Sequence, residues 1–166
     1  MTTVILFFLL ICLVLLSGFL SGSETAITAT SKARIIYQVK KGNKKAEYVL
    51  KILDNKDNVI SSLLLSNNLV NILASSLATA FFYDLFGVKG IFYSTLIMTV
   101  VLVIFAEVLP KTYAINRPTR TALIISPLIF FLNKSLFPFV FFINQVVKLI
   151  FKKSDSDSKN RDIQSE

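Results

Sequence analysis

The residues best suited to chemistry are oxygen donors within or beside long apolar runs of the chain. Hydroxyl, amide, carbonyl and carboxylate oxygens bind hard divalent cations such as Mg²⁺ or Ca²⁺, and they do not suit zinc or copper. The sequence therefore predicts a cation site built from oxygen. The donors form four groups: Ser21-Gly22-Ser23-Glu24-Thr25, Ser66 to Asn71, Glu107, and Pro110-Lys111.

The second and third groups place amide and carboxylate oxygens at membrane depth. Asn67 and Asn71 are four residues apart, so on a helix both amides lie on one face. Glu107 is an ionisable residue near the end of an apolar run, which makes it a functional candidate. Pro110 cannot donate to the carbonyl four residues back, so we expect the carbonyl of Ala106 to be free beside Glu107.

Glycine, proline and lysine next to these donors are expected to shape the site. Gly22 allows the first apolar helix to open and to expose carbonyls among the hydroxyls of Ser21 and Ser23. Pro110 and Lys111 are assigned to helix distortion or gating, and Lys111 is able to reach the cytoplasm instead of pairing with Glu107.

Each group also has an alternative interpretation in which it stabilises the fold and binds no ion. Small residues from Ser21 to Thr25 allow close helix packing, and Asn67 and Asn71 would then be inter-helix hydrogen bonds worth ~0.6 kcal/mol each. Glu107 would face water at the membrane boundary. A sodium ion would share the cavity of the divalent ion or have its own polar site near Ser75, Ser76 and Thr79, although helix packing is the preferred explanation of those three residues.

Composition indicates an all-α membrane protein. Of 166 residues, 54% are hydrophobic and 17% charged, with a mean hydropathy of +0.66, which is too apolar for a soluble domain. The absence of His excludes a Ser-His-Asp triad and an imidazole zinc ligand. Cys12 is the one cysteine, so an internal disulfide is excluded. We expect no catalytic residues and no enzymatic activity.

Three transmembrane helices are predicted at about 4–22, 60–84 and 91–109. A signal peptide is the alternative for the first, but its start carries no positive side chain. Lys and Arg gather between Lys32 and Lys56 and after the third run, with Lys89 alone between the second and third. The positive-inside rule then places the N-terminus outside and the C-terminus in the cytoplasm. A nucleic-acid partner is not expected, because no basic fold motif accompanies the charge.

Shorter elements are expected on the cytoplasmic side. Residues 31–56 alternate apolar and basic positions and break at Gly42-Asn43, which predicts a hairpin of two amphipathic helices. For residues 123–151 we prefer a juxtamembrane helical belt over a fourth span, because Lys134 would be costly facing lipid. Residues 152–166 are a polar linker or tail.

Three segments together resemble the transmembrane domain of the CorC/CNNM (cyclin M) magnesium transporters. They are LSGFLSGSETAITA at 16–29, SNNLVNI at 66–72 and FAEVLPKTYA at 105–114. The resemblance covers residues 1–151 as one such domain. It implies Mg²⁺ export coupled to sodium entry, a homodimer in the plasma membrane, and an ion site that maps onto Ser21, Gly22, Ser23, Asn67, Asn71 and Glu107.

Two features depart from that family. Ser66 stands where relatives often have glycine, and the CBS-pair domains into which relatives continue are absent from this sequence. Nucleotide binding, which belongs to that pair, is therefore not expected here. The competing hypothesis is a non-transporting membrane scaffold or regulator of ion homeostasis, with the basic hairpin and belt recruiting partners or anionic lipid.

Overall fold

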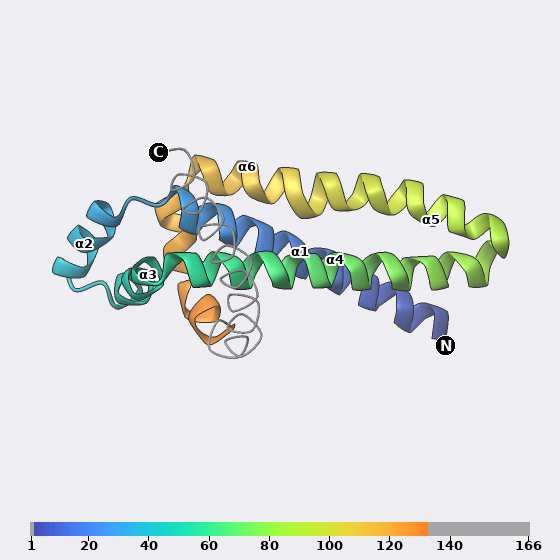
Figure 1. The fold of residues 1–166 in the computed structure, drawn as a ribbon, viewed down its shortest axis with the longest axis horizontal. Coiled ribbons are helices and arrows are strands. Elements are labelled where there is room, and N and C mark those ends of the chain that lie inside the picture. Colours follow the sequence, from blue (N-terminus) through green and yellow to red (C-terminus); the bar gives the residue numbers. More distant parts are fainter. Residues whose placement is uncertain (1, 133–166) are drawn as a thin grey trace, which may run out of the picture.

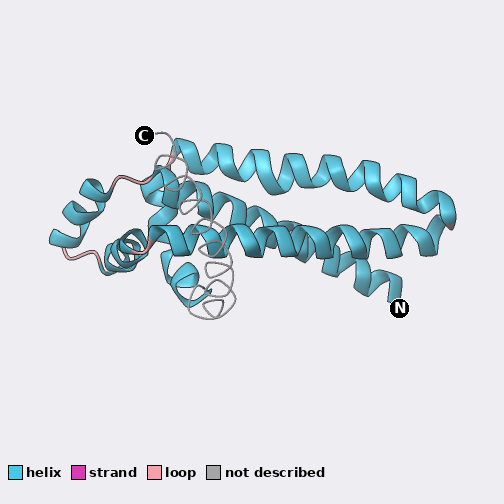
Figure 2. Cartoon of the chain, viewed as in Figure 1, coloured by secondary structure: helices cyan, strands magenta, loops and turns pink. Residues whose placement is uncertain are grey.

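A computed structural model describes residues 2–132, which form three long helices with shorter helices gathered at one end (Figures 1 and 2). No strand occurs within this part of the chain. A further helix, Pro118–Leu132, runs across the long helices near that end and is called the crosswise helix below. The other elements are α1 (Thr2–Ala29), α2 (Lys32–Lys40), α3 (Lys44–Asp54), α4 (Lys56–Phe86), α5 (Val88–Val101), η1 (Leu102–Val108) and α6 (Leu109–Asn116).

Three segments are long and apolar enough to cross a membrane: Thr3–Ala29, Lys56–Phe86 and Val88–Asn116. They confirm the predicted all-α fold with three spans. Each helix is longer than the span predicted for it, because polar residues at the ends continue the helix beyond the apolar run. A helix of 27 residues is ~40 Å long and exceeds the ~30 Å hydrocarbon core, so its ends project from it.

The helix pair predicted for residues 31–56 is present as α2 and α3. Gly42 takes a left-handed conformation with φ +79° just after α2, where a side chain would be strained. The Asn43 side chain then accepts a hydrogen bond from the backbone N–H of Lys45 at 3.1 Å and caps α3. The turn is therefore encoded locally, by Gly42 and Asn43.

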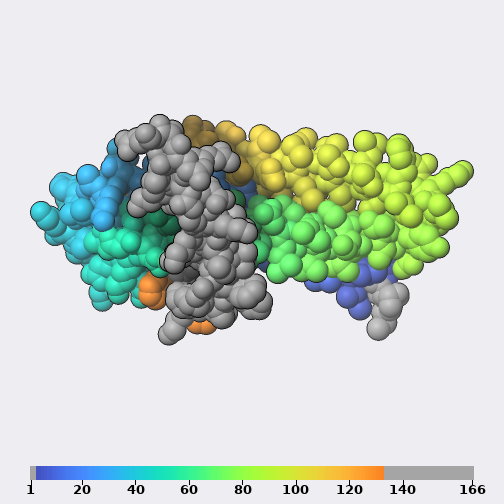
Figure 3. All heavy atoms as spheres, viewed as in Figure 1, coloured from blue at the N-terminus to red at the C-terminus, as the bar shows by residue number. Residues whose placement is uncertain are grey.

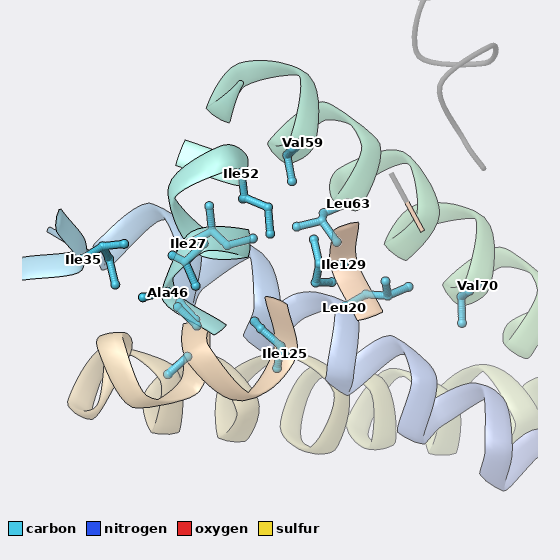
Figure 4. Close-up of a cluster of buried hydrophobic side chains, with 14 residues drawn as sticks. Leu20, Ile27, Ile35, Ala46, Ile52, Val59, Leu63, Val70, Ile125 and Ile129 are labelled. Atoms are coloured by element: carbon cyan, nitrogen blue, oxygen red, sulfur yellow. The ribbon is translucent and has the colours of Figure 1, made fainter. Parts of the chain in front are cut away.

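One buried cluster joins the hairpin and the crosswise helix to the ends of α1 and α4 nearest the hairpin (Figure 4). Its side chains come from all four parts, so burial of the hairpin is coupled to packing of the spans. Its side chains larger than alanine are Leu20, Ile27, Ile35, Val49, Ile52, Val59, Leu63, Val70, Ile125 and Ile129.

A second, smaller cluster packs the other half of the bundle. Leu10 of α1 meets Ala74 and Ala78 of α4 and Met98 of α5. The side chains of α4 and α5 lie against each other along this half (Figure 3). Residues 133–166, which include most of the predicted belt and the polar tail, lie outside the described residues.

Helix α1 approaches the third span closely at two glycines. A Cβ added at Gly18 would lie 3.2 Å from both the carbonyl oxygen of Phe105 and Cγ of Pro110. One added at Gly22 would lie 3.3 Å from Cβ of Pro110. The expectation that Gly22 opens α1 is wrong: α1 continues unbroken to Ala29, and Gly22 instead admits the proline ring.

Replacing Gly18 with valine is expected to push α1 away from η1 and α6, because neither the Phe105 carbonyl nor the Pro110 ring is a flexible chain end. Overpacking of this kind costs ~1–3 kcal/mol. The measurement is thermal unfolding of the purified chain in detergent. Ala80→Val, at an exposed position of α4, is the control and should unfold near the wild-type temperature. Equal unfolding temperatures for the two variants would contradict this packing.

Candidate cation site

Ser17 of α1 holds two amides of α4 in the middle of the bundle. Its Oγ lies 2.9 Å from Oδ1 of Asn67 and 2.5 Å from Oδ1 of Asn71. Ser17 is fully buried and Asn67 is 6% exposed. The two asparagines therefore face the same point, as their spacing predicts, and three oxygen atoms converge there.

A single hydroxyl proton serves two carbonyl-type acceptors in this cluster. Ser17 Oγ is able to donate to only one of the two amide oxygens. The second asparagine then has two possible arrangements. Either its amide turns so that the NH₂ group donates to Ser17 Oγ, or its Oδ1 and Ser17 Oγ face each other with their lone pairs. A cation at this point would relieve the second arrangement, so the cluster has the electrostatic character of a cation ligand set.

Ser21 supplies a fourth buried oxygen one turn further along α1. Its side chain is fully buried, and its Oγ has no hydrogen-bond partner among the described residues. At 100° per residue, Ser21 lies between Ser17, which faces α4, and Gly18 and Gly22, which face Pro110. Its hydroxyl therefore lies where α1, α4 and the third span meet, at the cost of an unmade hydrogen bond.

The third span changes its hydrogen-bond register next to this point. Residues Leu102–Val108 form a π-helix, in which the backbone N–H of Leu109 donates to the carbonyl oxygen of Ile104, five residues back. The next carbonyl in that register, that of Phe105, would take its hydrogen bond from position 110. Proline has no N–H there, so this carbonyl has no donor in the π ladder. Short π segments occur frequently at functional sites.

The Phe105 carbonyl is therefore the backbone oxygen that the register exposes toward α1. It would lie 3.2 Å from a Cβ at Gly18, the neighbour of Ser17. The sequence-based expectation named the carbonyl of Ala106, four residues before Pro110, since it assumed an α-helical register. The π register moves the effect of the proline back by one residue.

Glu107 lies on η1, next to the residue that contacts α1. Ala106 is fully buried, and its Cα would lie 3.7 Å from a Cβ at Gly18. Glu107 itself is half-buried, as is Lys111, and neither forms an ion pair within the described residues. The carboxylate is thus placed on the flank of the α1 contact, and no lysine or arginine among residues 2–132 pairs with it.

Two of the predicted ligands lie apart from the cluster. Ser23 is buried, but its Oγ donates to the carbonyl of Phe19 within α1 at 2.6 Å, and it lies more than 120° around the helix from Ser21. Gly22 packs against the ring of Pro110 and supplies no oxygen ligand in this arrangement. Residues 2–132 contain no group of three His, Cys, Asp or Glu side chains that could hold a metal, so any cation here rests mainly on neutral oxygens.

Ser17 and the Phe105 carbonyl are the contributors that sequence reasoning missed. Ser17 was assigned no role from the sequence. Its spacing of four residues from Ser21 was the available signal, since it puts both hydroxyls on one face. No side-chain pattern reveals a carbonyl, and only the π register identifies Phe105.

Comparison with known proteins gives the chain's relatives. Residues 7–165 match the profile of the family described as the cyclin M transmembrane N-terminal domain. The chain is 38% identical over 137 residues to the UPF0053 inner membrane protein YfjD of Escherichia coli, covering 82% of the chain and 32% of that protein. A UPF0053 protein of Haemophilus influenzae is 36% identical over 149 residues, covering 90% of the chain and 34% of that protein.

A more distant relative is a putative DUF21 domain-containing chloroplastic protein of Arabidopsis thaliana. It is 26% identical over 130 residues, which cover 78% of the chain and 20% of that protein. The chain thus spans about a third of the length of the two bacterial relatives and less of the plant protein.

Replacing Ser17 with alanine is expected to separate α1 from the asparagine pair, because both amides lose their partner. Inter-helix hydrogen bonds in membranes are worth ~0.6 kcal/mol on average and up to ~1.7 kcal/mol, so the free energy of unfolding should fall within that range. Unfolding of the purified chain by dodecyl sulfate measures the change. Ser23→Ala is the matched control, since it removes an equally buried hydroxyl that bonds only within α1. An equal loss in both variants would contradict the bridging role.

Proposed function

Because the chain belongs to the cyclin M transmembrane domain family, we propose that it exports Mg²⁺ across the plasma membrane, coupled to sodium entry. One observation carries the proposal: the Ser17 hydroxyl of α1 and the Asn67 and Asn71 amide oxygens of α4 lie together inside the bundle. The buried Ser21 hydroxyl lies one helical turn away, and the Phe105 carbonyl of the third span faces α1 at Gly18, two residues before Glu107. The ligands proposed are Ser17, Ser21, Asn67, Asn71, Glu107 and the Phe105 carbonyl.

The charge of this ligand set suits a transported Mg²⁺ rather than a permanently bound one. One carboxylate and several neutral oxygens leave net positive charge on a divalent ion, so the ion is held weakly enough to leave. Mg²⁺ prefers six oxygen ligands at ~2.0–2.1 Å and gives up its water reluctantly. Closely spaced oxygens such as Ser17 Oγ and the two amides would replace part of that shell.

The third span supplies a means of changing the site during transport. Hydrogen bonds in a π segment span five residues instead of the four of an α-helix, and a change between the two registers moves carbonyls and side chains together. Conversion of η1 between π and α registers would carry Glu107 around the helix axis relative to Ser17. Pro110 and Lys111 would act in this step, with Pro110 preventing a regular α-helical ladder.

The topology proposed follows the distribution of basic residues. The domain is membrane-embedded and has three spans. Eight Lys and Arg lie between the first two spans, from Lys32 to Lys56, and Lys89 alone follows the turn between α4 and α5. The positive-inside rule puts the hairpin in the cytoplasm and the N-terminus outside. Glu107 is then nearer the cytoplasmic end of the third span, and Mg²⁺ would enter from that side.

A homodimer is proposed from the outer face of α4. Asn68 and Ser76 are exposed there, and with Asn71, Ile72 and Ser75 they line a shallow groove along the helix. Polar side chains facing hydrocarbon are costly, and small polar residues promote helix association in membranes. A second copy packed on this groove would remove those side chains from lipid.

Cysteine cross-linking tests the dimer. In a Cys12→Ser background, Ser76→Cys is expected to form a disulfide-linked dimer in membranes on mild oxidation. Phe92→Cys, on the exposed face of α5, is the control and should remain monomeric. Cross-linking of the control alone would overturn the proposed interface.

Magnesium efflux from proteoliposomes tests the transport proposal. Glu107→Gln keeps the shape of the side chain and removes its charge, so efflux driven by an inward sodium gradient is expected to fall at least tenfold. Glu47→Gln, an exposed carboxylate of α3, should transport like the wild type. If Glu107→Gln exports Mg²⁺ at the wild-type rate at matched protein levels, the proposed site is wrong.

A further inference from the structure

The crosswise helix has one exposed apolar face that fixes its depth in a bilayer. Ile124, Leu128 and Phe131 lie at i, i+4 and i+7 and are 61%, 52% and 74% exposed. The opposite face carries Ile125 and Ile129, which are buried against the spans. The exposed face therefore belongs in hydrocarbon, and the helix lies at the boundary between acyl chains and headgroups.

Helix α3 is attached to the same crosswise helix by three contacts. Ser126 Oγ donates to the carbonyl oxygen of Lys45 at 3.3 Å. The rings of Tyr48 and Phe130 are 5.6 Å apart between centroids, and Lys51 Nζ lies 5.9 Å from the Phe130 centroid. In Figure 1, α3 lies beyond the crosswise helix on the side away from the bundle. These contacts hold α3 at headgroup depth.

The exposed face of α3 is basic and aromatic at the point of attachment. Lys44, Tyr48 and Lys51 follow one another at i, i+4 and i+7 on one helical face, and all three are exposed. Neither Lys44 nor Lys51 forms an ion pair within the described residues. The ion pair found in the hairpin joins Lys32 to Asp54 at 2.7 Å. From Lys32 to Lys56, eight basic and two acidic side chains leave a formal charge of +6.

We propose that the seam formed by Lys44, Tyr48, Lys51 and Phe130 binds the headgroup of an anionic phospholipid of the adjacent leaflet. Unpaired ammonium groups complement a lipid phosphate, and each contributes ~1 kcal/mol, or about fivefold, near an anionic surface. Tyr48 and Phe130 are 39% and 38% exposed, and a tyrosine, with its apolar ring and polar hydroxyl, is typical of the membrane interface. An acidic protein surface would match the charge but not the neighbouring lipid-facing apolar face.

A single introduced tryptophan reports which lipids occupy this seam. The chain has no tryptophan, so Phe131→Trp, beside the seam, gives one emission source. The purified chain is reconstituted in mixed vesicles of phosphatidylcholine and phosphatidylglycerol in which one lipid at a time carries brominated, quenching acyl chains. The ratio of the two quenching efficiencies measures enrichment of the anionic lipid.

We expect phosphatidylglycerol to be enriched several-fold at residue 131, and Lys44→Gln with Lys51→Gln to reduce the enrichment to twofold or less. The matched control is Lys40→Gln with Lys41→Gln, which removes the same charge from the exposed turn of the hairpin and should retain the enrichment. Equal quenching by both lipids in the wild type would overturn the proposal in favour of another occupant, such as an acidic protein. An equal loss in the control would overturn it in favour of a diffuse surface charge.

Discussion

The absence of an N–H on Pro110 is the constraint on which the rest of the site depends. It leaves a gap in the hydrogen-bond ladder of the third span directly after the π segment Leu102–Val108, where that span lies against α1. The same proline needs room, which Gly18 and Gly22 provide by lacking side chains. One residue thus affects both the hydrogen bonding of η1 and the packing of α1 against it.

This close approach gives α1 two different faces. The glycine face contacts the third span, while Ser17 faces α4 and bonds to Asn67 and Asn71. Ser21 lies between the faces with a buried hydroxyl that no described residue satisfies. Such a group lowers stability unless something else binds it. Destabilising groups are often retained where function requires them, and Ser21 lies one helical turn from the Ser17 hydroxyl that bonds to α4.

Much of the fold could be predicted from the sequence, because hydropathy, spacing and turn residues act locally. Three spans, the hairpin and its break at Gly42-Asn43 follow from such patterns. Helix ends were predicted less well, since α1 continues through Gly22 and the third span through Pro110. Spacing also predicted that Asn67 and Asn71 share a face, but not the residue that they contact.

The remainder of the site depends on helix packing and backbone register, which spacing does not encode. Ser17 becomes a bridging residue only because α4 lies against that face of α1. Ser23 resembles Ser21 in type and position, yet its hydroxyl bonds within its own helix. The Phe105 carbonyl follows from a π turn that a proline permits but does not by itself predict.

Calorimetric titration of Mg²⁺ into the purified chain, beside Ser21→Ala, tests the central claim most directly. If the unpartnered hydroxyl is retained to bind the ion, the variant should unfold at a higher temperature without Mg²⁺ and bind Mg²⁺ at least tenfold more weakly. Saturable binding by the wild type is expected in the same experiment. Unchanged Mg²⁺ affinity in a stabilised Ser21→Ala variant would contradict the claim that these oxygens form the cation site.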